Sequence, residues 1–164
     1  MMIVSERSAS RPATFQSWMF GPASGEEAPV PPAADLAPHP PSQIRARRIL
    51  VIEDNQDAAQ TLGDYLELVG HEVCLAFTGP SGVEAAYQFL PDVVLCDLGL
   101  PGMSGWEVAQ ALRSTQSTSG ARLIAITGYG TDEDRRKSTE AGFETHLTKP
   151  IDVDVLELLL SRGS

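Results

Sequence analysis

Three carboxylates, one hydroxyl group and one ammonium group each follow a short apolar run of the sequence. Glu53 and Asp54 follow Ile-Leu-Val-Ile, Asp97 follows Val-Val-Leu-Cys, Thr127 follows Leu-Ile-Ala-Ile, and Lys149 follows a weaker run and precedes a proline. Short apolar runs of this kind are typical of buried parallel strands, which present functional groups at their carboxyl ends. We therefore expect all five side chains on one rim of a sheet.

The chemistry of such a rim is set by its charge and its donor atoms. Neighbouring carboxylates raise one another's pKa unless a cation lies between them. Because the donors are oxygen atoms without His or Cys, we expect a hard divalent ion, and Mg²⁺ that keeps several waters fits best. One carboxylate beside Mg²⁺ and a lysine can attack phosphorus and form an acyl phosphate. Lys149 and the ion would neutralise the phosphoryl oxygens, and the Thr127 hydroxyl would donate a hydrogen bond to them.

The elements that must position these groups are visible from Arg48 onward, where short apolar runs alternate with amphipathic stretches. This alternation is typical of a parallel sheet with helices on both faces. Strands are predicted at Ile49 to Ile52, Val73 to Ala76, Val93 to Cys96, Leu123 to Ile126 and Thr145 to Leu147. Helices are predicted at about Asp57 to Val69, Ser81 to Phe89, Trp106 to Ser114, Asp132 to Ala141 and Val153 to Leu160.

We expect a flavodoxin-like, doubly wound α/β fold with a five-stranded parallel sheet of order 2-1-3-4-5 and five helices. In that order the first and third strands are neighbours. Glu53 and Asp54 then lie close to Asp97, with Thr127 and Lys149 on the other side of it.

The chain divides into two unequal parts. Residues 1–44 hold eight of the 12 prolines and show no helical or strand period, so we expect a disordered tail rich in Pro and Ala. Residues 45–164 are expected to form one folded domain. A formal charge of -10 argues against direct DNA binding and against an anionic membrane surface. No apolar run is long enough for a membrane span and no secretion signal is recognisable, so a cytoplasmic protein is expected.

Taken in order, these motifs resemble those of response-regulator receiver domains. The resemblance rests on Ile-Leu-Val-Ile-Glu53-Asp54-Asn, on Asp97-Leu-Gly-Leu-Pro-Gly-Met-Ser-Gly105, on Leu-Ile-Ala-Ile-Thr127-Gly, and on Ala-Gly-Phe through Lys149-Pro150. It covers about Arg48 to Leu160. It implies a phosphoprotein of a two-component system, in which an aspartate takes a phosphoryl group from a phosphohistidine.

Carried over residue by residue, the resemblance implies that Asp97 is the phosphoacceptor. Glu53, Asp54, Asp97 and the backbone carbonyl of Gly99 would hold Mg²⁺. Thr127 and Lys149 would contact the phosphoryl oxygens, and the Lys149-Pro150 peptide bond is expected to be cis.

One departure from the family pattern concerns the conformational switch. Where the family usually has Tyr or Phe, three residues before the lysine, this chain has His146. A histidine can pack as an aromatic ring and can also titrate near neutral pH, which puts the usual coupling of Thr127 to that ring in doubt. The alternative is that His146 has no switching role. Gly99 and Tyr129 stand where the family tunes hydrolysis of its acyl phosphate.

Three other classes of protein compete with this interpretation. A flavodoxin-like cofactor module needs a phosphate loop with backbone donors after its first strand, whereas Glu53 and Asp54 would repel a phosphate. A haloacid-dehalogenase-like phosphatase would carry paired aspartates two residues apart. A receiver-shaped binding module that is never phosphorylated shares the fold, but the full set of acceptor, metal and phosphate-contact residues argues against it.

The expected partners follow from the resemblance and from where the sequence stops. It stops soon after the fifth predicted helix, so no C-terminal output domain is expected, and the domain would signal through protein contacts rather than act as an enzyme. We expect a sensor histidine kinase or a histidine phosphotransfer protein as phosphoryl donor, and a downstream protein target. The last part of the chain is similar to the C-terminal receivers of hybrid histidine kinases. On phosphorylation, Thr127 and the loop after it should move toward Asp97 and shift the helix that begins at Asp132 and the strand around His146.

Overall fold

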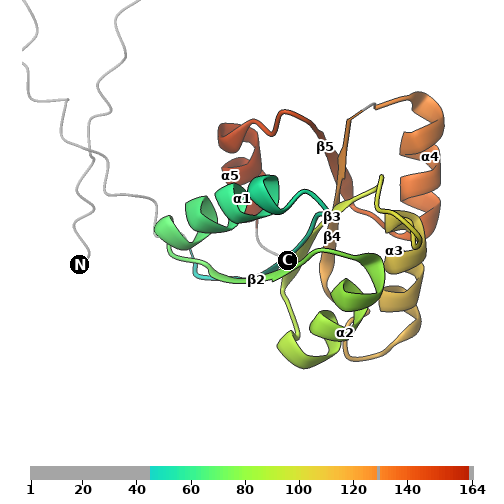
Figure 1. The fold of residues 1–164 in the computed structure, drawn as a ribbon, viewed down its shortest axis with the longest axis horizontal. Helices are drawn as coiled ribbons and strands as arrows, with labels where there is room; N and C mark the ends of the chain where they lie inside the picture. The colour runs from blue at the N-terminus through green and yellow to red at the C-terminus, as the bar shows by residue number, and fades with distance from the viewer. Residues whose placement is uncertain (1–44, 129, 163–164) are drawn as a thin grey trace, which may run out of the picture. The chain divides into compact units, whose positions relative to one another are not determined.

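The computed structural model describes residues 45–128 and 130–162. Five strands and five helices alternate along this part of the chain, and Figure 1 shows how they are arranged. The strands are β1 (Arg48–Ile52), β2 (Glu72–Ala76), β3 (Val93–Asp97), β4 (Arg122–Thr127) and β5 (Thr145–Thr148). The helices are α1 (Gln56–Leu68), α2 (Gly79–Phe89), α3 (Gly105–Ser114), α4 (Asp132–Ala141) and α5 (Val153–Ser161).

The five strands form one parallel sheet in the order β2-β1-β3-β4-β5, which confirms the predicted doubly wound, flavodoxin-like fold. Ile52 at the end of β1 is paired with Cys96 in β3. The register therefore places the residues after these two, Glu53 and Asp97, side by side at the carboxyl edge. On the other side of β3, Asp97 is paired with Ile126.

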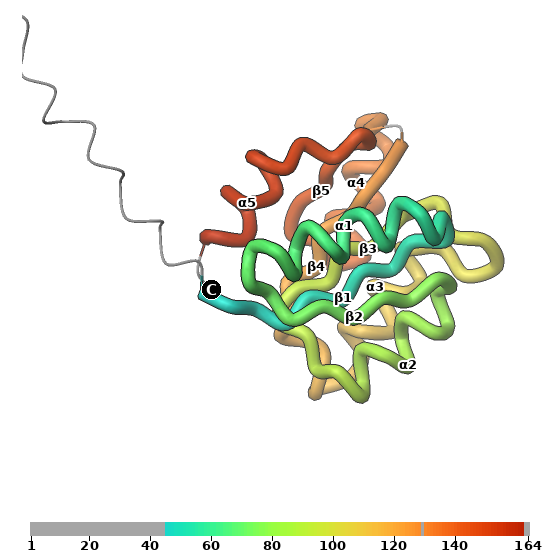
Figure 2. Tube along the Cα trace, turned by 60° about the vertical axis from the view of Figure 1, so that its left-hand side comes forward, coloured from blue at the N-terminus to red at the C-terminus, as the bar shows by residue number. Residues whose placement is uncertain are grey.

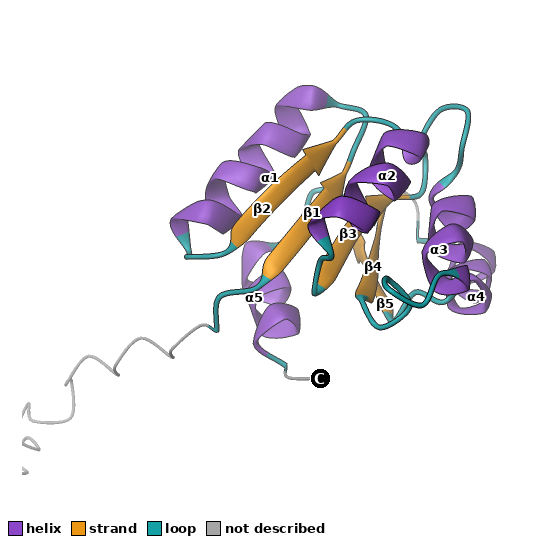
Figure 3. Cartoon of the chain, turned by 90° about the horizontal axis from the view of Figure 1, so that it is seen from below, coloured by secondary structure: helices purple, strands orange, loops and turns teal. Residues whose placement is uncertain are grey.

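Helices cover both faces of the sheet, and each face has its own apolar core. One core packs the sheet against α2, α3 and α4 through Ala86, Val108, Leu112 and Ala141. The other packs it against α1 and α5 through Leu66, Leu156 and Leu160. Figure 3 shows the sheet between these two layers. The strands β1, β3 and β4 are buried on both faces, which explains why each contains four consecutive apolar residues.

Each helix begins at a residue that caps it. The side chains of Asn55, Thr78, Ser104, Thr131 and Asp152 accept hydrogen bonds from backbone N–H groups of the first turns. In a parallel α/β fold these helix starts follow the carboxyl ends of the strands. The N-terminal ends of the helices, with their partial positive charge, therefore lie near the rim that carries the carboxylates.

The layer formed by α1 and α5 is joined by a polar contact as well as by its core. Figure 2 shows the two helices on the same side of the sheet, and the hydroxyl of Tyr65 donates a hydrogen bond to the carboxylate of Glu157. This bond raises the pKa of Tyr65 to about 12, with burial adding to the effect. The contact connects α1, which leaves the rim after Asp54, to α5, which follows Lys149.

The ends of the predicted elements differ from the observed ones by at most two residues. The helix predicted from Ser81 begins at Gly79 because Thr78 is its cap. The predicted tail of residues 1–44 and the prediction for Tyr129 lie outside the described residues. Among the helices of the described segments, none combines the length and the apolar character that crossing a membrane requires.

His71, between α1 and β2, should make the stability of the domain sensitive to acid. Its side chain is 7% exposed, and its Nδ1 accepts a hydrogen bond from the backbone N–H of Arg47 at 3.2 Å. Burial, and then the charge of Arg47, lower its pKa. Below about pH 6.5, His71 therefore binds a proton more readily in the unfolded chain than in the folded domain. We expect the free energy of unfolding to fall, by at most about 1.4 kcal/mol per pH unit, as the pH drops below that value.

Urea unfolding between about pH 5 and pH 7.5 measures this dependence, with His71→Asn as the comparison. The Asn side chain retains an acceptor for the Arg47 N–H but does not titrate. The difference in stability between wild type and variant should therefore change with pH in this range. Parallel pH profiles for the two proteins would contradict the prediction.

Candidate functional site

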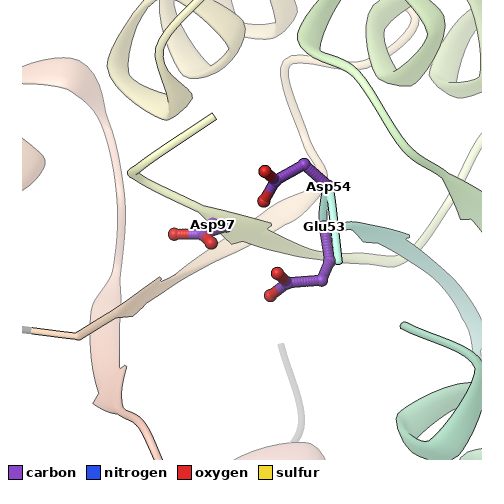
Figure 4. Close-up of side chains that lie close together, drawn as sticks. All are labelled: Glu53, Asp54 and Asp97. Carbon is purple, nitrogen blue, oxygen red and sulfur yellow. The ribbon is translucent and has the colours of Figure 1, made fainter. Parts of the chain in front are cut away.

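Three carboxylates meet at the carboxyl edge of the sheet. Each of Glu53, Asp54 and Asp97 has a carboxylate oxygen that lies within 4.8 Å of the other two. Figure 4 shows Glu53 and Asp54 at the end of β1, with their carboxylates on the side where Asp97 lies. Glu53 and Asp97 are 4% and 7% exposed, whereas Asp54 is exposed. The cluster therefore has two buried members and one that faces solvent.

Lys149 supplies the positive charge of the cluster. Its Nζ lies 2.6 Å from Oε2 of Glu53 and 2.7 Å from Oδ2 of Asp97. Burial of the ammonium group opposes its charge, but its hydrogen bonds to Asp97 and Glu53 outweigh this and raise the pKa of Lys149. The sequence prediction placed Lys149 on the far side of Asp97 from Glu53. The structure shows that the side chain instead joins both carboxylates, although two strands separate β5 from β1. The Lys149-Pro150 peptide bond is cis, as predicted.

The second oxygen of Asp97 is held by the loop that follows β3. Oδ1 accepts a hydrogen bond from the backbone N–H of Gly99 at 2.8 Å. The carboxylate is thus fixed in orientation, with Oδ1 toward the loop and Oδ2 toward Lys149. The role of the Gly99 carbonyl as a metal ligand stays a prediction.

The loop must also pass very close to the start of α3. A Cβ at Gly105 would lie 2.4 Å from the carbonyl oxygen of Asp97 and 2.9 Å from Cα of Leu98. Only glycine fits such an approach of one backbone to another. Gly105 therefore fixes where α3 begins relative to the backbone of Asp97.

A groove of about 270 Å³ runs from Asp97 toward α3 and α4. Thr127, at the end of β4, lines it and is 7% exposed, so the predicted hydrogen-bond donor lies beside Asp97. Trp106 and Asp134 also line it. The sequence placed Trp106 at the start of a predicted helix and Asp134 inside another, without predicting that either residue lies at the site. Both stand in the first turn of a helix that follows a rim strand, and that position was the signal that could have identified them.

His146 lies on β5, half-buried, and its Cα is paired with that of Ala125 in β4. Burial, and then the charge of Arg135, lower its pKa. The imidazole is therefore held more firmly neutral at pH 7 than an exposed histidine would be. Whether it replaces the usual switch aromatic stays a prediction.

The cluster fits a hard divalent cation. Its donors are carboxylate oxygens within reach of a common ion, and the described residues offer no His or Cys among them. Lys149 already neutralises part of the charge, which leaves an excess of negative charge for an ion. Asp54 is the carboxylate that forms no ion pair with Lys149.

The chain belongs to the family of response regulator receiver domains. Residues 49–161 match the family described by that name. Over 109 residues the chain is 35% identical to protein PilH of Pseudomonas aeruginosa. This match covers 66% of the chain and 90% of PilH. Over 107 residues it is 34% identical to the DNA-binding dual master transcriptional regulator RpaA of Synechocystis, but this match spans 65% of the chain and only 44% of RpaA.

Solved structures agree with this assignment. The receiver domain of sensor histidine kinase PA1611 of Pseudomonas aeruginosa, which has a magnesium ion coordinated in its active-site cleft, is 27% identical with a TM-score of 0.66. The match covers 71% of this chain and 96% of that one. A second match is to the co-crystal structure of the histidine phosphotransfer protein Ypd1 and the receiver domain of Ssk1 from Saccharomyces cerevisiae, at 25% identity and a TM-score of 0.65. It covers 71% of this chain and 87% of the matched chain.

Proposed function

We propose that this chain accepts a phosphoryl group on Asp97 from a phosphohistidine and uses it as a signal in a two-component phosphorelay. The observation that carries the proposal is the fixed orientation of the buried Asp97 carboxylate. Oδ1 accepts a hydrogen bond from the Gly99 N–H, Oδ2 pairs with Lys149, and the two other carboxylates each have an oxygen within 4.8 Å of one of Asp97. Family membership supports it, because the matched family is that of response regulator receivers.

In the proposed step, a carboxylate oxygen of Asp97 forms a bond to phosphorus while the bond from phosphorus to the histidine nitrogen breaks. The electron pair of that bond stays on the imidazole, and an acyl phosphate remains on Asp97. Transfer of this kind depends on positioning and on neutralising the phosphoryl oxygens. Lys149 supplies a positive charge to them, and Thr127 would donate a hydrogen bond from the opposite side of Asp97.

Glu53, Asp54, Asp97 and the Gly99 carbonyl would hold Mg²⁺. When bound, the ion supplies positive charge to the phosphoryl oxygens. The residues of this chain orient the Asp97 carboxylate and keep it largely out of water. The magnesium ion coordinated in the related PA1611 receiver supports this part of the proposal.

The donor is proposed to be a sensor histidine kinase or a histidine phosphotransfer protein, as the Ypd1–Ssk1 complex suggests. A phosphohistidine must approach the rim from outside. A groove of about 590 Å³, lined by Ala58, Leu62 and Tyr65 of α1 and by Ile151 and Val153 near α5, opens beside Glu53 and Lys149. Its apolar walls and its continuity with the site fit the helix of a histidine-bearing partner. The signal would pass to a downstream protein through contacts, and the chain itself would not be an enzyme.

The test is incubation of the full chain with acetyl phosphate, with and without Mg²⁺, followed by intact-mass measurement. We expect a mass increase of one phosphoryl group that requires Mg²⁺, because the small donor replaces only the phosphohistidine. Peptide mapping should place the group on Asp97.

Two variants separate the acceptor from a general loss of charge. Asp97→Asn should remove the modification, whereas Asp64→Asn should retain it. Asp64 is an exposed residue of α1 that accepts a hydrogen bond from Gln60. A wild-type chain that is not modified by acetyl phosphate and does not bind beryllofluoride in the presence of Mg²⁺ would favour a receiver-shaped module that is not phosphorylated.

A further inference from the structure

Helix α4 is attached to the domain by few contacts. Of its ten residues only Ser138 and Ala141 are buried, and its first turn carries three acidic residues. At its C-terminal end, the guanidinium group of Arg113 donates hydrogen bonds to the carbonyl of Gly142 at 2.7 and 3.2 Å. An element with little buried apolar surface is among the least costly parts of a domain to move.

The middle of α4 is held by Trp106 of α3. The indole Nε1–H donates a hydrogen bond to Oγ of Ser138 at 3.2 Å, and Ser138 is 2% exposed. Nζ of Lys137 lies 5.7 Å from the centre of the indole ring, within the range of a cation–π contact. These contacts from one aromatic side chain fix the middle of α4 relative to α3.

The same side chain lines the groove that begins at the phosphoacceptor. Asp97, Thr127, Gly128, Asp134 and Trp106 all border it. A phosphoryl group on Asp97 would add a charge of about -1.5 to -2 and three acceptor oxygens to this groove. It would repel the carboxylate of Asp134 in the first turn of α4. It would also draw Thr127 toward Asp97. Thr127 is four positions before Thr131, the residue that caps α4.

We propose that the hydrogen bond from Trp106 to Ser138 holds α4 in its unmodified position and that this bond is lost when the domain is phosphorylated. The inference rests on the proposed function, because a phosphoryl group on Asp97 is what displaces α4. The bond then sets how much of the unmodified protein already adopts the signalling conformation. Breaking it raises that fraction and strengthens binding of a phosphoryl mimic, since apparent affinity is reduced by the fraction of competent protein.

The experiment measures the affinity for beryllofluoride at saturating Mg²⁺ by calorimetry on the full chain. Trp106→Phe retains a ring and removes the donor, and Ser138→Ala removes the acceptor. Each should bind the mimic roughly 2- to 10-fold more tightly than wild type, the range expected for one neutral hydrogen bond. The double variant should match either single variant, because both remove the same bond.

A matched control loses a hydrogen bond that joins α3 to α2 instead of to α4. The hydroxyl of Tyr87 on α2 lies 3.3 Å from Oγ1 of Thr115 at the end of α3, so Tyr87→Phe should leave the affinity for the mimic unchanged. A spectroscopic reading comes from Trp18→Phe, which leaves Trp106 as the single tryptophan. Its emission should shift when the mimic binds, because the indole loses its partner.

The outcomes distinguish the two proposals. If wild type binds the mimic and Trp106→Phe and Ser138→Ala bind it equally well or more weakly, the bond does not oppose signalling and the inference is overturned. If wild type binds no mimic and takes no phosphoryl group, the proposed function fails and the inference fails with it. A purely structural contact would lower the stability of both variants without changing their affinity for the mimic.

Discussion

Lys149→Met should lower the rate of phosphoryl acceptance from acetyl phosphate by about 100-fold or more, the loss typical when one preorganised charge is removed from a reacting centre. Nζ of Lys149 pairs with Oδ2 of Asp97 at 2.7 Å, which places the ammonium group beside the proposed phosphoacceptor. Methionine has similar length and flexibility but carries no charge. Time courses of intact mass at saturating Mg²⁺ measure the effect.

The same substitution should tighten Mg²⁺ binding. Lys149 competes for the negative charge of Glu53 and Asp97, whose side chains are only 5% and 10% exposed. Without it, the carboxylates repel one another and a divalent ion becomes their main source of positive charge. We expect about a 10-fold lower dissociation constant for Mg²⁺, a conservative value for one partly exposed charge.

Opposite changes in transfer rate and in metal affinity distinguish this role from simple unfolding, which would weaken both. Arg136→Met removes a positive charge from the exposed pair of Arg136 with Glu140 on α4 and should change neither quantity appreciably. Weaker Mg²⁺ binding in Lys149→Met would show that the lysine helps to organise the metal site and would contradict the electrostatic argument.

The strands followed from the sequence because fully buried strands leave a strong pattern, whereas their order was an expectation taken from the doubly wound class of fold. The run Ile-Leu-Val-Ile in β1 is apolar at every position, and the structure buries all four residues. The strand ends then placed Glu53 and Asp97 on one rim through backbone register alone, without any information on side chains. Backbone regularity of this kind is what makes a rim of carboxylates predictable.

Contacts that depend on the length and direction of side chains were not predictable in this way. Lys149 reaches Glu53 across the intervening strands because its side chain is long, so strand order alone placed it too far away. Arg122 is another example. It begins β4, is 8% exposed, and forms a bidentate pair with Glu144, whereas the sequence prediction began this strand at Leu123. Because buried strands are recognised by their apolar residues, a buried arginine at the start of a strand is not predicted from the sequence.

The packing of helices against each other near the rim was not predictable from the sequence either. The hydrogen bond from Trp106 to Ser138 depends on how α3 and α4 cross, and the periodicity of each helix carries no information about its neighbour. His71 lies between the predicted first helix and second strand, where the sequence gives no sign that the structure buries it against Arg47. In each case the missing information is the relative position of two elements rather than the type of either.

Gly105→Ala should be among the most destabilising single-methyl additions in the described part of the chain. The new Cβ would lie 2.4 Å from the carbonyl oxygen of Asp97, and backbone atoms cannot rotate out of the way as a side chain can. Alanine favours a helix over glycine by up to about 1 kcal/mol, which offsets part of the cost. We expect a net loss of about 2 to 3 kcal/mol in the free energy of unfolding, measured by urea denaturation.

Function should fall together with stability in this variant, because α3 can move away only by displacing the backbone of Asp97. Phosphoryl acceptance should therefore be slower even under conditions where the variant remains folded. Gly120→Ala is the control. No atom lies within 4 Å of a Cβ at that position and its φ is not in the left-handed region, so its stability should stay within about 0.5 kcal/mol of wild type. A stable Gly105→Ala variant with an unchanged transfer rate would mean that the start of α3 is free to shift without moving the phosphoacceptor.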